Sequence, residues 1–316
     1  MRYFIVILLC IAFKAEGQII RANPFHTSRV VTVVTDTLLL DSFPAAAGYS
    51  LRKLKSSYTG NCIKVRKTLN NTEQDIGFVN NFLDTASLKT FVGTSNGFVV
   101  TWYDQSGNGR DASNSTTTSQ PKIYDSATAS LSKRNNKVSL APDGGDELKI
   151  TTGLDILQNK GYGYCFSVNC SVISSVINYL LFISNNVAGT ARFLVDFNRT
   201  TNQRNGIGGR RLDANSFTSI QSSSNFSLTN LQLVSSIIDY ATSDAYIYRN
   251  GTSVASNTSF LTDGNTSNTA SASMSLFGAS GTNLNGSCSE IIIYNTNESS
   301  NRTTIENNIN RNWLIY

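Results

Sequence analysis

The stretch that decides the fold is TWYDQSGNGR, residues 101–110, where an apolar strand runs directly into a loop of turn-forming residues. The segment from Phe98 to Tyr103 is apolar and rich in residues that favour β-strands. It is followed by residues that cannot continue a strand, namely Asp104, Ser106, Gly107, Asn108 and Gly109. The loop is therefore either a fixed structural corner or an edge that contacts a ligand.

Outward from this corner, most of the chain has the pattern of short strands separated by Gly, Asn and Ser turns. The clearest predicted strands are residues 179–184, 192–197, 231–234, 245–248, 274–277 and 290–294. Asn250-Gly251 is the strongest hairpin signal, because this pair readily adopts the positive φ angles of a type I′ turn. Strands of this number and spacing predict an all-β fold, a two-sheet antiparallel sandwich.

Three short helices are expected around the sandwich. Pro44 at a first helical position predicts a helix over residues 44–55 with Leu51 and Leu54 facing inward. Asp84 as N-cap and Gly93 as terminator bound a helix over residues 85–92. The third helix spans residues 301–313, and its apolar stripe consists of Ile305, Ile309 and Trp313.

Composition and charge exclude some classes of partner. The 316 residues are 40% hydrophobic, which is enough for a full core, and only 15% charged. The net charge of +5 is mild and the basic residues are scattered, whereas a nucleic-acid binder concentrates them on one face. We therefore expect no nucleic-acid partner.

The N-terminus has the pattern of a secretory signal. Residues 1–17 combine Arg2, an apolar run over residues 3–13 and a small-x-small cleavage site at Ala15-Glu16-Gly17. The apolar run is too short to span a bilayer comfortably, and no later segment is apolar for long enough. We expect a signal peptide (1–17), an arm (18–37), a sandwich domain (38–316) and an extracellular location. An uncleaved N-terminal anchor is the alternative.

Four cysteines remain after the signal: Cys62, Cys165, Cys170 and Cys288. An oxidising compartment permits two disulfides in any of three pairings. Each cysteine also lies in a β-prone segment, where a small buried thiol fits equally well. Both possibilities stay open, as does the oligomeric state.

Several segments together resemble a known family. They are AGYSLRKL (47–54), IKVR (63–66), QDIGF (74–78) and WYDQSGNG (102–109), with SEIIIY (289–294), SNR (300–302) and IENNI (305–309) near the end. The first four segments resemble the N-terminal half of the catalytic domain of α-L-arabinofuranosidase B and a group of secreted bacterial and phage-associated proteins. The last three are similar to the closing strand and helix of that group. The resemblance implies a concanavalin A/laminin G-like sandwich, or jelly roll.

The resemblance does not carry catalytic residues onto this chain. The family places its catalytic carboxylates in a cysteine-rich central segment that ends in a glutamate and in a later Gly/Asp-containing segment, and residues 151–280 contain neither motif. Asp143, Asp146 and Glu147 cluster on an expected loop, and Glu290 heads an expected buried strand. The single histidine, His26, leaves nucleophilic triads without a base. We expect no enzyme, with an arabinofuranosidase-like glycoside hydrolase using Asp143 or Glu290 as the alternative.

Sugar binding by a sandwich needs exposed aromatic rings and polar groups that meet hydroxyls. The predicted ligand-binding residues are Trp102, Tyr103, Asp104, Asn108, Arg110, Arg210 and Arg211. A core position is the favoured alternative for Trp102, which lies inside an apolar strand, and a solvated hairpin tip is the alternative for the two arginines. The pattern Asp104-x-Ser106-x-Asn108 also imitates the start of a calcium loop, although Ser115 stands where an EF-hand needs glutamate. A turn in which Asp104 and Asn108 bond their own backbone is the favoured explanation of this motif, and calcium is the alternative and the one candidate cofactor.

These observations predict a secreted or surface carbohydrate-binding module for glycans or cell-surface polysaccharides, with a role in recognition or adhesion. The phage-associated relatives make a virion component, such as a fibre, collar or capsid decoration, the structural alternative.

Overall fold

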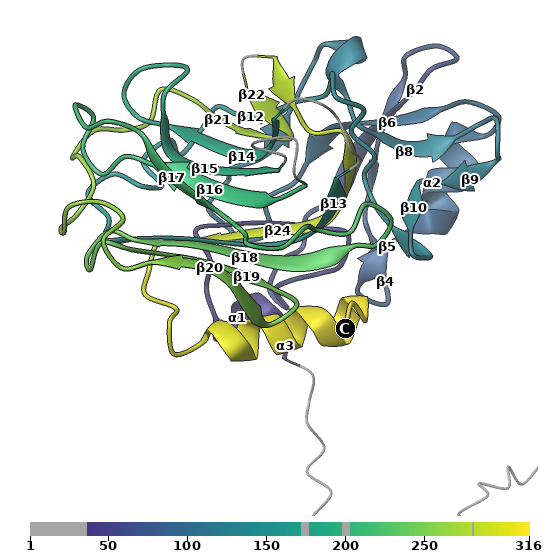
Figure 1. The fold of residues 1–316 in the computed structure, drawn as a ribbon. Helices are drawn as coiled ribbons and strands as arrows, with labels where there is room; N and C mark the ends of the chain where they lie inside the picture. Colours follow the sequence, from purple (N-terminus) through teal and green to yellow (C-terminus); the bar gives the residue numbers. More distant parts are fainter. Residues whose placement is uncertain (1–36, 172–176, 198–202, 280) are drawn as a thin grey trace, which may run out of the picture. The chain divides into compact units, whose positions relative to one another are not determined.

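In this computed structural model of the chain, the described residues are 37–171, 177–197, 203–279 and 281–316. The predicted signal peptide and all but the last residue of the predicted arm lie outside the described residues. The described part is a sandwich of two antiparallel β-layers with one long helix against it (Figure 1).

The smaller sheet has six strands and is formed by segments far apart in the sequence. In spatial order the strands are β1 (Ala47–Ser50), β24 (Gly286–Tyr294), β13 (Tyr162–Ser171), β18 (Gln232–Asp239), β19 (Asp244–Arg249) and β20 (Thr252–Asn257). The longest strands, β13 and β24, are almost wholly buried, which explains their nearly continuous apolar or small residues.

The larger sheet begins with four strands that are neighbours both in space and along the chain. They are β17 (Thr218–Gln221), β16 (Asn205–Gly209), β15 (Ala191–Phe197) and β14 (Asn178–Ser184). The path then continues through β21 (Met274–Leu276), β12 (Leu148–Ile150), β7 (Ala112–Ser113), β6 (Gly97–Trp102), β2 (Ile63–Lys67) and β3 (Glu73–Ile76).

Short strands extend this framework. β8 (Lys122–Asp125) pairs with β6, and β9 (Ser130–Leu131) pairs with β8. β23 (Thr282–Asn283) pairs with β14 and with β22 (Gly278–Ala279). Two separate ribbons are β4 (Phe78–Val79) with β5 (Phe82–Leu83), and β10 (Lys133–Arg134) with β11 (Lys137–Val138).

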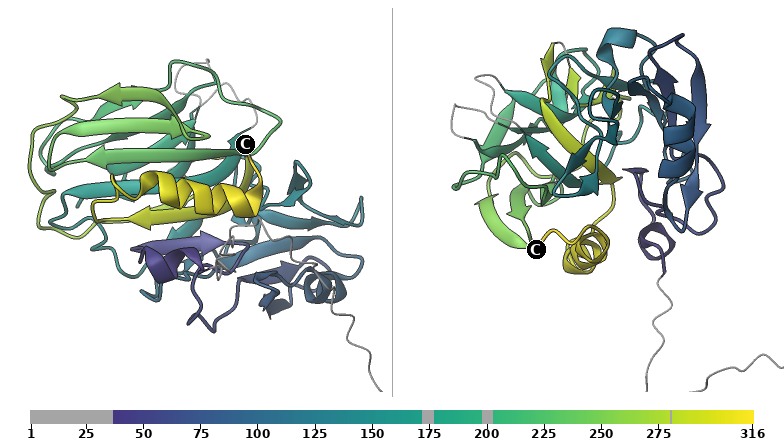
Figure 2. Two further views of the ribbon diagram at one scale, coloured as in Figure 1. Left: turned by 90° about the horizontal axis from the view of Figure 1, so that it is seen from below. Right: turned by 90° about the vertical axis from the view of Figure 1, so that its right-hand side faces the viewer.

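Three α-helices and one 3₁₀ turn complete the described part: α1 (Leu39–Ser42), α2 (Thr85–Val92), α3 (Arg302–Trp313) and η1 (Thr117–Ser119). Helix α3 lies across the outer face of the smaller sheet (Figures 1 and 2). Its apolar stripe is buried there, with Ile305, Ile309 and Trp313 at most 4% exposed.

A buried ionic network fixes α3 to this sheet. Glu290 on β24 is fully buried and pairs with Arg52, whose Nε lies 2.7 Å from Oε2. The same carboxylate accepts hydrogen bonds from Ser50 Oγ (2.7 Å) and Trp313 Nε1 (2.8 Å). Arg52 also donates to Asn308 on α3. The charge of Glu290 is thus neutralised, and its oxygens are satisfied by hydrogen-bond donors, as burial requires.

Most elements expected from the sequence are confirmed. The all-β sandwich is observed, as are helices α2 and α3 and the six strands predicted most clearly. Asp84 caps α2 by accepting from the backbone N–H groups of Ala86 and Ser87. Asn250 and Gly251 both have positive φ at the predicted hairpin.

The helix expected over residues 44–55 is wrong. The structure instead has α1 before Pro44 and strand β1 after it. β1 pairs with residues 290–293 of β24 and is buried throughout, so strand pairing overrides the helical preference of the alanines. Leu51 and Leu54 do face inward, at 2% and 0% exposure, but from irregular backbone.

The four cysteines of the described residues are free thiols, and all are buried. This arrangement corresponds to the core-thiol alternative. A search of the described residues finds no helix with the length and hydropathy of a membrane span.

Candidate functional site

The corner after β6 is held by its own polar side chains. Asp104 is 4% exposed, and its carboxylate accepts from the N–H groups of Gly48 (2.8 Å), Ser106 (2.9 Å) and Arg110 (3.1 Å) and from Ser106 Oγ (2.7 Å). Gln105 bonds the backbone of residues 50, 52 and 54. The loop therefore ties β6 to the segment around β1.

The proposed sugar contacts of this corner need correction. Trp102 is fully buried and stacks on Phe277 with ring centroids 5.9 Å apart. Trp102 thus takes the core position favoured from the sequence, and a ring in the core has no open face for a sugar. Tyr103 is half-buried, and its hydroxyl donates to Asp75.

Asn108 and Arg110 also bond within the molecule. The Asn108 amide donates to the carbonyl oxygens of Ala45 and Ala46, and Arg110 donates to Ala46, Gly153 and Asp155. With Asp104, they serve the corner rather than an open surface.

Asp104, Ser106 and Asn108, the candidate calcium ligands, bond one another in a turn, which is the explanation favoured from the sequence. The Asn108 amide donates to Ser106 Oγ at 3.0 Å, and Ser106 Oγ donates to Asp104. Within the described residues, no group of three His, Cys, Asp or Glu side chains is placed to hold a metal ion. Calcium at this loop stays a prediction.

Arg210 and Arg211 lie far from the corner. β16 and β6 are six strand positions apart in the larger sheet, a separation of about 29 Å at about 4.8 Å per strand. Arg211 donates to Thr262 Oγ1 (3.0 Å) and to the carbonyl of Asn265 (3.1 Å). Arg210 lines a hollow on the larger sheet. The structure thus does not bring the predicted ligand-binding residues together.

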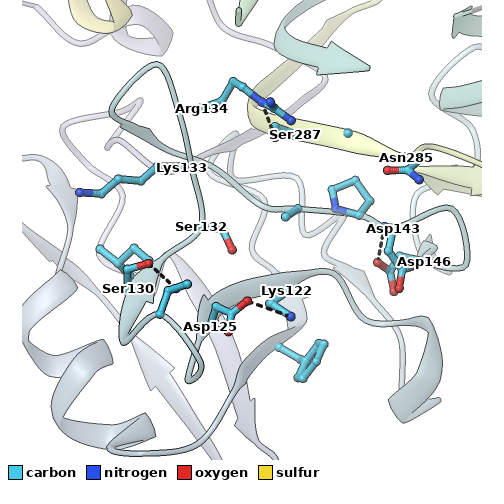
Figure 3. Close-up of a pocket in the computed structure, with 16 residues that line it drawn as sticks. Lys122, Asp125, Ser130, Ser132, Lys133, Arg134, Asp143, Asp146, Asn285 and Ser287 are labelled. Carbon is cyan, nitrogen blue, oxygen red and sulfur yellow. Dashed lines mark hydrogen bonds and ion pairs between the residues drawn. The ribbon is translucent and has the colours of Figure 1, made fainter. Parts of the chain in front are cut away.

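A different region has the convergence of polar groups expected of a site. A groove of about 600 Å³, called here the polar groove, lies between β8–β10, the loop over residues 141–146 and the start of β24 (Figure 3). Its walls carry three cations and three carboxyl groups together with amide and hydroxyl groups. The principal lining residues are Lys122, Asp125, Lys133, Arg134, Asp143, Asp146, Asn285 and Ser287.

The β-framework positions each wall of the groove. On β8, Lys122 Nζ lies 3.3 Å from Asp125 Oδ2. The backbone N–H of Ala127 and the Lys122 ammonium lower the pKa of Asp125. On β10, Arg134 Nε donates to Ser287 Oγ at the start of β24, at 3.4 Å.

The third wall is a tight turn, Asp143-Gly144-Gly145-Asp146. Gly144 has φ of +97°, a conformation that favours glycine, and Gly145 N–H donates to Asp143 Oδ1. The Asp143 N–H donates to Asp146 Oδ2 at 2.9 Å. Asp143 also forms an antiparallel β-bridge with Asn285. Figure 3 shows the two carboxyl groups side by side on this wall.

Asp146 has an unusual proton affinity. Its side chain is 4% exposed, and burial, reinforced by the negative charge of Asp143, raises the pKa of Asp146 to about 7. The groove therefore holds an acid that changes charge near neutral pH. Such perturbed groups concentrate at functional sites.

The sequence pointed to only part of this groove. Asp143 and Asp146 were visible as an acidic cluster, but Lys122, Arg134 and Asn285 were not identified. They come from separate segments that only the strand pairing brings together, and no local motif marks them. The short Asp-Gly-Gly-Asp turn is the signal that could have located the groove.

No family model matches the chain, and no curated protein sequence matches it. Solved structures do match. An arabinofuranosidase complexed with arabinofuranosyl-α-1,2-xylobiose superposes with a TM-score of 0.56 at 14% identity, over 86% of this chain and 64% of that one. A GH54 α-L-arabinofuranosidase soaked with a cyclic sulfate inhibitor gives a TM-score of 0.52 at 13% identity, over 84% and 62%. This chain shares their fold.

The match spans less than two thirds of the length of either arabinofuranosidase. The resemblance drawn from the sequence is thereby supported for the architecture of the sandwich.

Proposed function

We propose that this chain is a non-catalytic, secreted or surface β-sandwich that binds carbohydrate in the polar groove. The observation that carries the proposal is the convergence of three cations, three carboxyl groups and the Asn285 amide in one groove of about 600 Å³. Alternating donors and acceptors suit the hydroxyl groups of a sugar, and the volume suits a small oligosaccharide. The sandwich shared with arabinofuranosidases supports the same class of ligand.

Binding to arabinan, arabinoxylan and a glycan array tests this proposal. We expect Arg134→Gln to weaken binding about tenfold, because Arg134 lines the groove and a lost charge-assisted hydrogen bond is worth about 1.5–3 kcal/mol. Lys137→Gln is the matched control, since Lys137 pairs with Arg134 across β10–β11 but does not line the groove. Failure of the native protein to bind any of these glycans would reject the proposal.

Asp146 favours glycoside hydrolysis as a second candidate. An acid with a pKa near 7 can protonate a leaving group at neutral pH. A hydrolase, however, needs its two carboxyl groups about 5 Å or about 6.5–9.5 Å apart, on either side of the bond. Asp143 and Asp146 come from one turn and share a side-chain hydrogen bond, which supports binding over catalysis.

Hydrolysis is tested by release of the chromophore from a chromogenic arabinofuranoside. Turnover that Asp146→Asn abolishes would establish the second candidate, and no turnover would leave binding as the function. Glu290 is removed as a catalytic candidate, because it is fully buried against Arg52.

A further inference from the structure

A second hollow lies on the larger sheet, away from the polar groove. This sheet-face hollow has a volume of about 240 Å³ and shares no lining residue with the polar groove. Its main lining residues are Tyr179, Phe182, Leu194, Asp196, Arg210 and Phe217. Phe182 and Leu194 belong to a small apolar cluster that is separate from the main core. The hollow is therefore on the outward face of the sheet.

A β-bulge places an aromatic ring on this face. In the pairing of β14 with β15, Tyr179 lies opposite Asp196 and Leu181 lies opposite Val195, so Leu180 is an extra residue. Leu180 and Leu181 both enter the main core. Without the bulge, strand alternation would put Tyr179 on the same face as Leu181.

Because of the bulge, Tyr179 packs beside Phe182 instead. Their rings stack with centroids 6.1 Å apart and planes at 12°. Bulges that redirect a side chain are concentrated near binding and active sites. The chain thus keeps an aromatic wall on an outward face where regular pairing would bury the ring.

Arg210 adds a polar group that the described part of the chain does not satisfy. Its Nε is buried, and among the described residues no hydrogen-bond partner is found for it. A buried donor without an acceptor costs about 1–3 kcal/mol, so it calls for an explanation. The adjacent Arg211, in contrast, donates from both Nε and Nη1.

We propose that the sheet-face hollow is a second carbohydrate subsite that takes an uncharged sugar ring. The C–H face of the sugar packs on Tyr179 and Phe217, and a sugar hydroxyl accepts a hydrogen bond from the guanidinium of Arg210, which lines the hollow. Arg210 and Asp196 are the charged residues that line this hollow, and their opposite charges give it no net charge that would favour a sugar acid. This inference rests on the proposed carbohydrate-binding function and adds a site to it.

A neighbouring hollow gives room for a ligand longer than one sugar unit. This hollow, of about 480 Å³, shares Phe182 and Gly189 with the sheet-face hollow and extends toward Lys149 and Glu147. Further sugar units therefore have room to continue across β14, β21 and β12. A single monosaccharide would leave this space unfilled.

The test is affinity electrophoresis of the full chain in gels that contain arabinoxylan or arabinan. We expect Tyr179→Ala and Arg210→Gln each to weaken retention about tenfold, while Tyr179→Phe retains binding because the ring is kept. Arg211→Gln is the matched control, an equal charge change outside the hollow. Thermal melting confirms that each variant is folded.

The outcomes separate this inference from the proposed function. If Arg134→Gln in the polar groove loses binding while the Tyr179 and Arg210 variants bind like the native chain, the subsite is rejected and the proposed function stands. If the hollow variants lose binding and Tyr179→Phe does not, the subsite is established. Retention of the native chain by neither polysaccharide, together with no binding on the glycan array, rejects both.

Discussion

At the scale of single residues, one carboxylate organises the corner between β6 and β7. Asp104 accepts four hydrogen bonds, three from backbone N–H groups and one from Ser106 Oγ. We expect Asp104→Ala to lower the free energy of unfolding by about 3 kcal/mol, because it leaves buried donors unsatisfied. Asp155→Ala is the control, since that carboxylate is 63% exposed and its ion pair with Arg110 is worth about 0–1 kcal/mol. Equal urea midpoints for the two variants would contradict this role.

Asp146 gives a prediction for the dependence of stability on pH. An unfolded aspartate titrates at about 3.9, whereas Asp146 in the folded chain titrates at about 7. The folded state therefore binds an extra proton between these values. Proton binding at Asp146 therefore stabilises the folded state. This contribution to the free energy of unfolding is complete below about pH 4 and is lost as the pH rises through 7.

Asp146→Asn cannot ionise, so we expect its melting temperature to fall less than that of the native chain between pH 5 and pH 8. Parallel melting curves at the two pH values measure the difference. Asp143→Asn serves as comparison, because it removes the neighbouring negative charge but keeps the titrating group. Identical pH dependence in Asp146→Asn and the native chain would disprove the assignment.

At the scale of elements, helix α3 depends on the ion pair beneath it. Glu290→Gln leaves the Arg52 guanidinium buried without its counter-ion, and we expect a loss of about 3–5 kcal/mol in urea unfolding. Trp313→Phe removes one hydrogen bond to Glu290 and should cost less, about 1–2 kcal/mol. Lys149→Gln, which breaks an exposed pair, is expected to change stability by about 0.5 kcal/mol or less. A Glu290→Gln protein as stable as Lys149→Gln would refute the role of this ion pair.

Local sequence signals were sufficient to predict some secondary-structure elements, but they gave a helix where residues 47–50 form a strand. The caps of α2, the apolar stripe of α3 and the Asn250-Gly251 turn each act within a few residues, so sequence alone predicts them. Residues 47–50 become a strand because β24, more than 200 positions later, supplies the partner. The bulge at Leu180 likewise depends on its register with β15 and leaves no local mark.

At the scale of the whole molecule, the sandwich was predictable and the site was not. The architecture was predictable because several local signals indicate the same fold. These signals are the strand pattern, the turn residues and the corner around Asp104. The polar groove needs Lys122, Arg134, Asp143 and Asn285 to meet, and each belongs to a different segment. The choice between core and sugar contact for Trp102 stays open in the sequence for the same reason, since only packing against Phe277 decides that the ring is interior.

The reactivity of the four buried thiols can report on the opening of the sandwich. Burial raises the pKa of Cys62, Cys165, Cys170 and Cys288, so each is both shielded from reagents and held in its unreactive protonated form. In a Cys10→Ser protein, we expect a chromogenic disulfide to label these sulfurs only as fast as the chain unfolds, and completely in strong denaturant. Rapid labelling in native buffer would show that part of one sheet opens locally without unfolding of the whole chain. The cysteines on β2, β13 and β24 would then show which part of the sandwich loosens first.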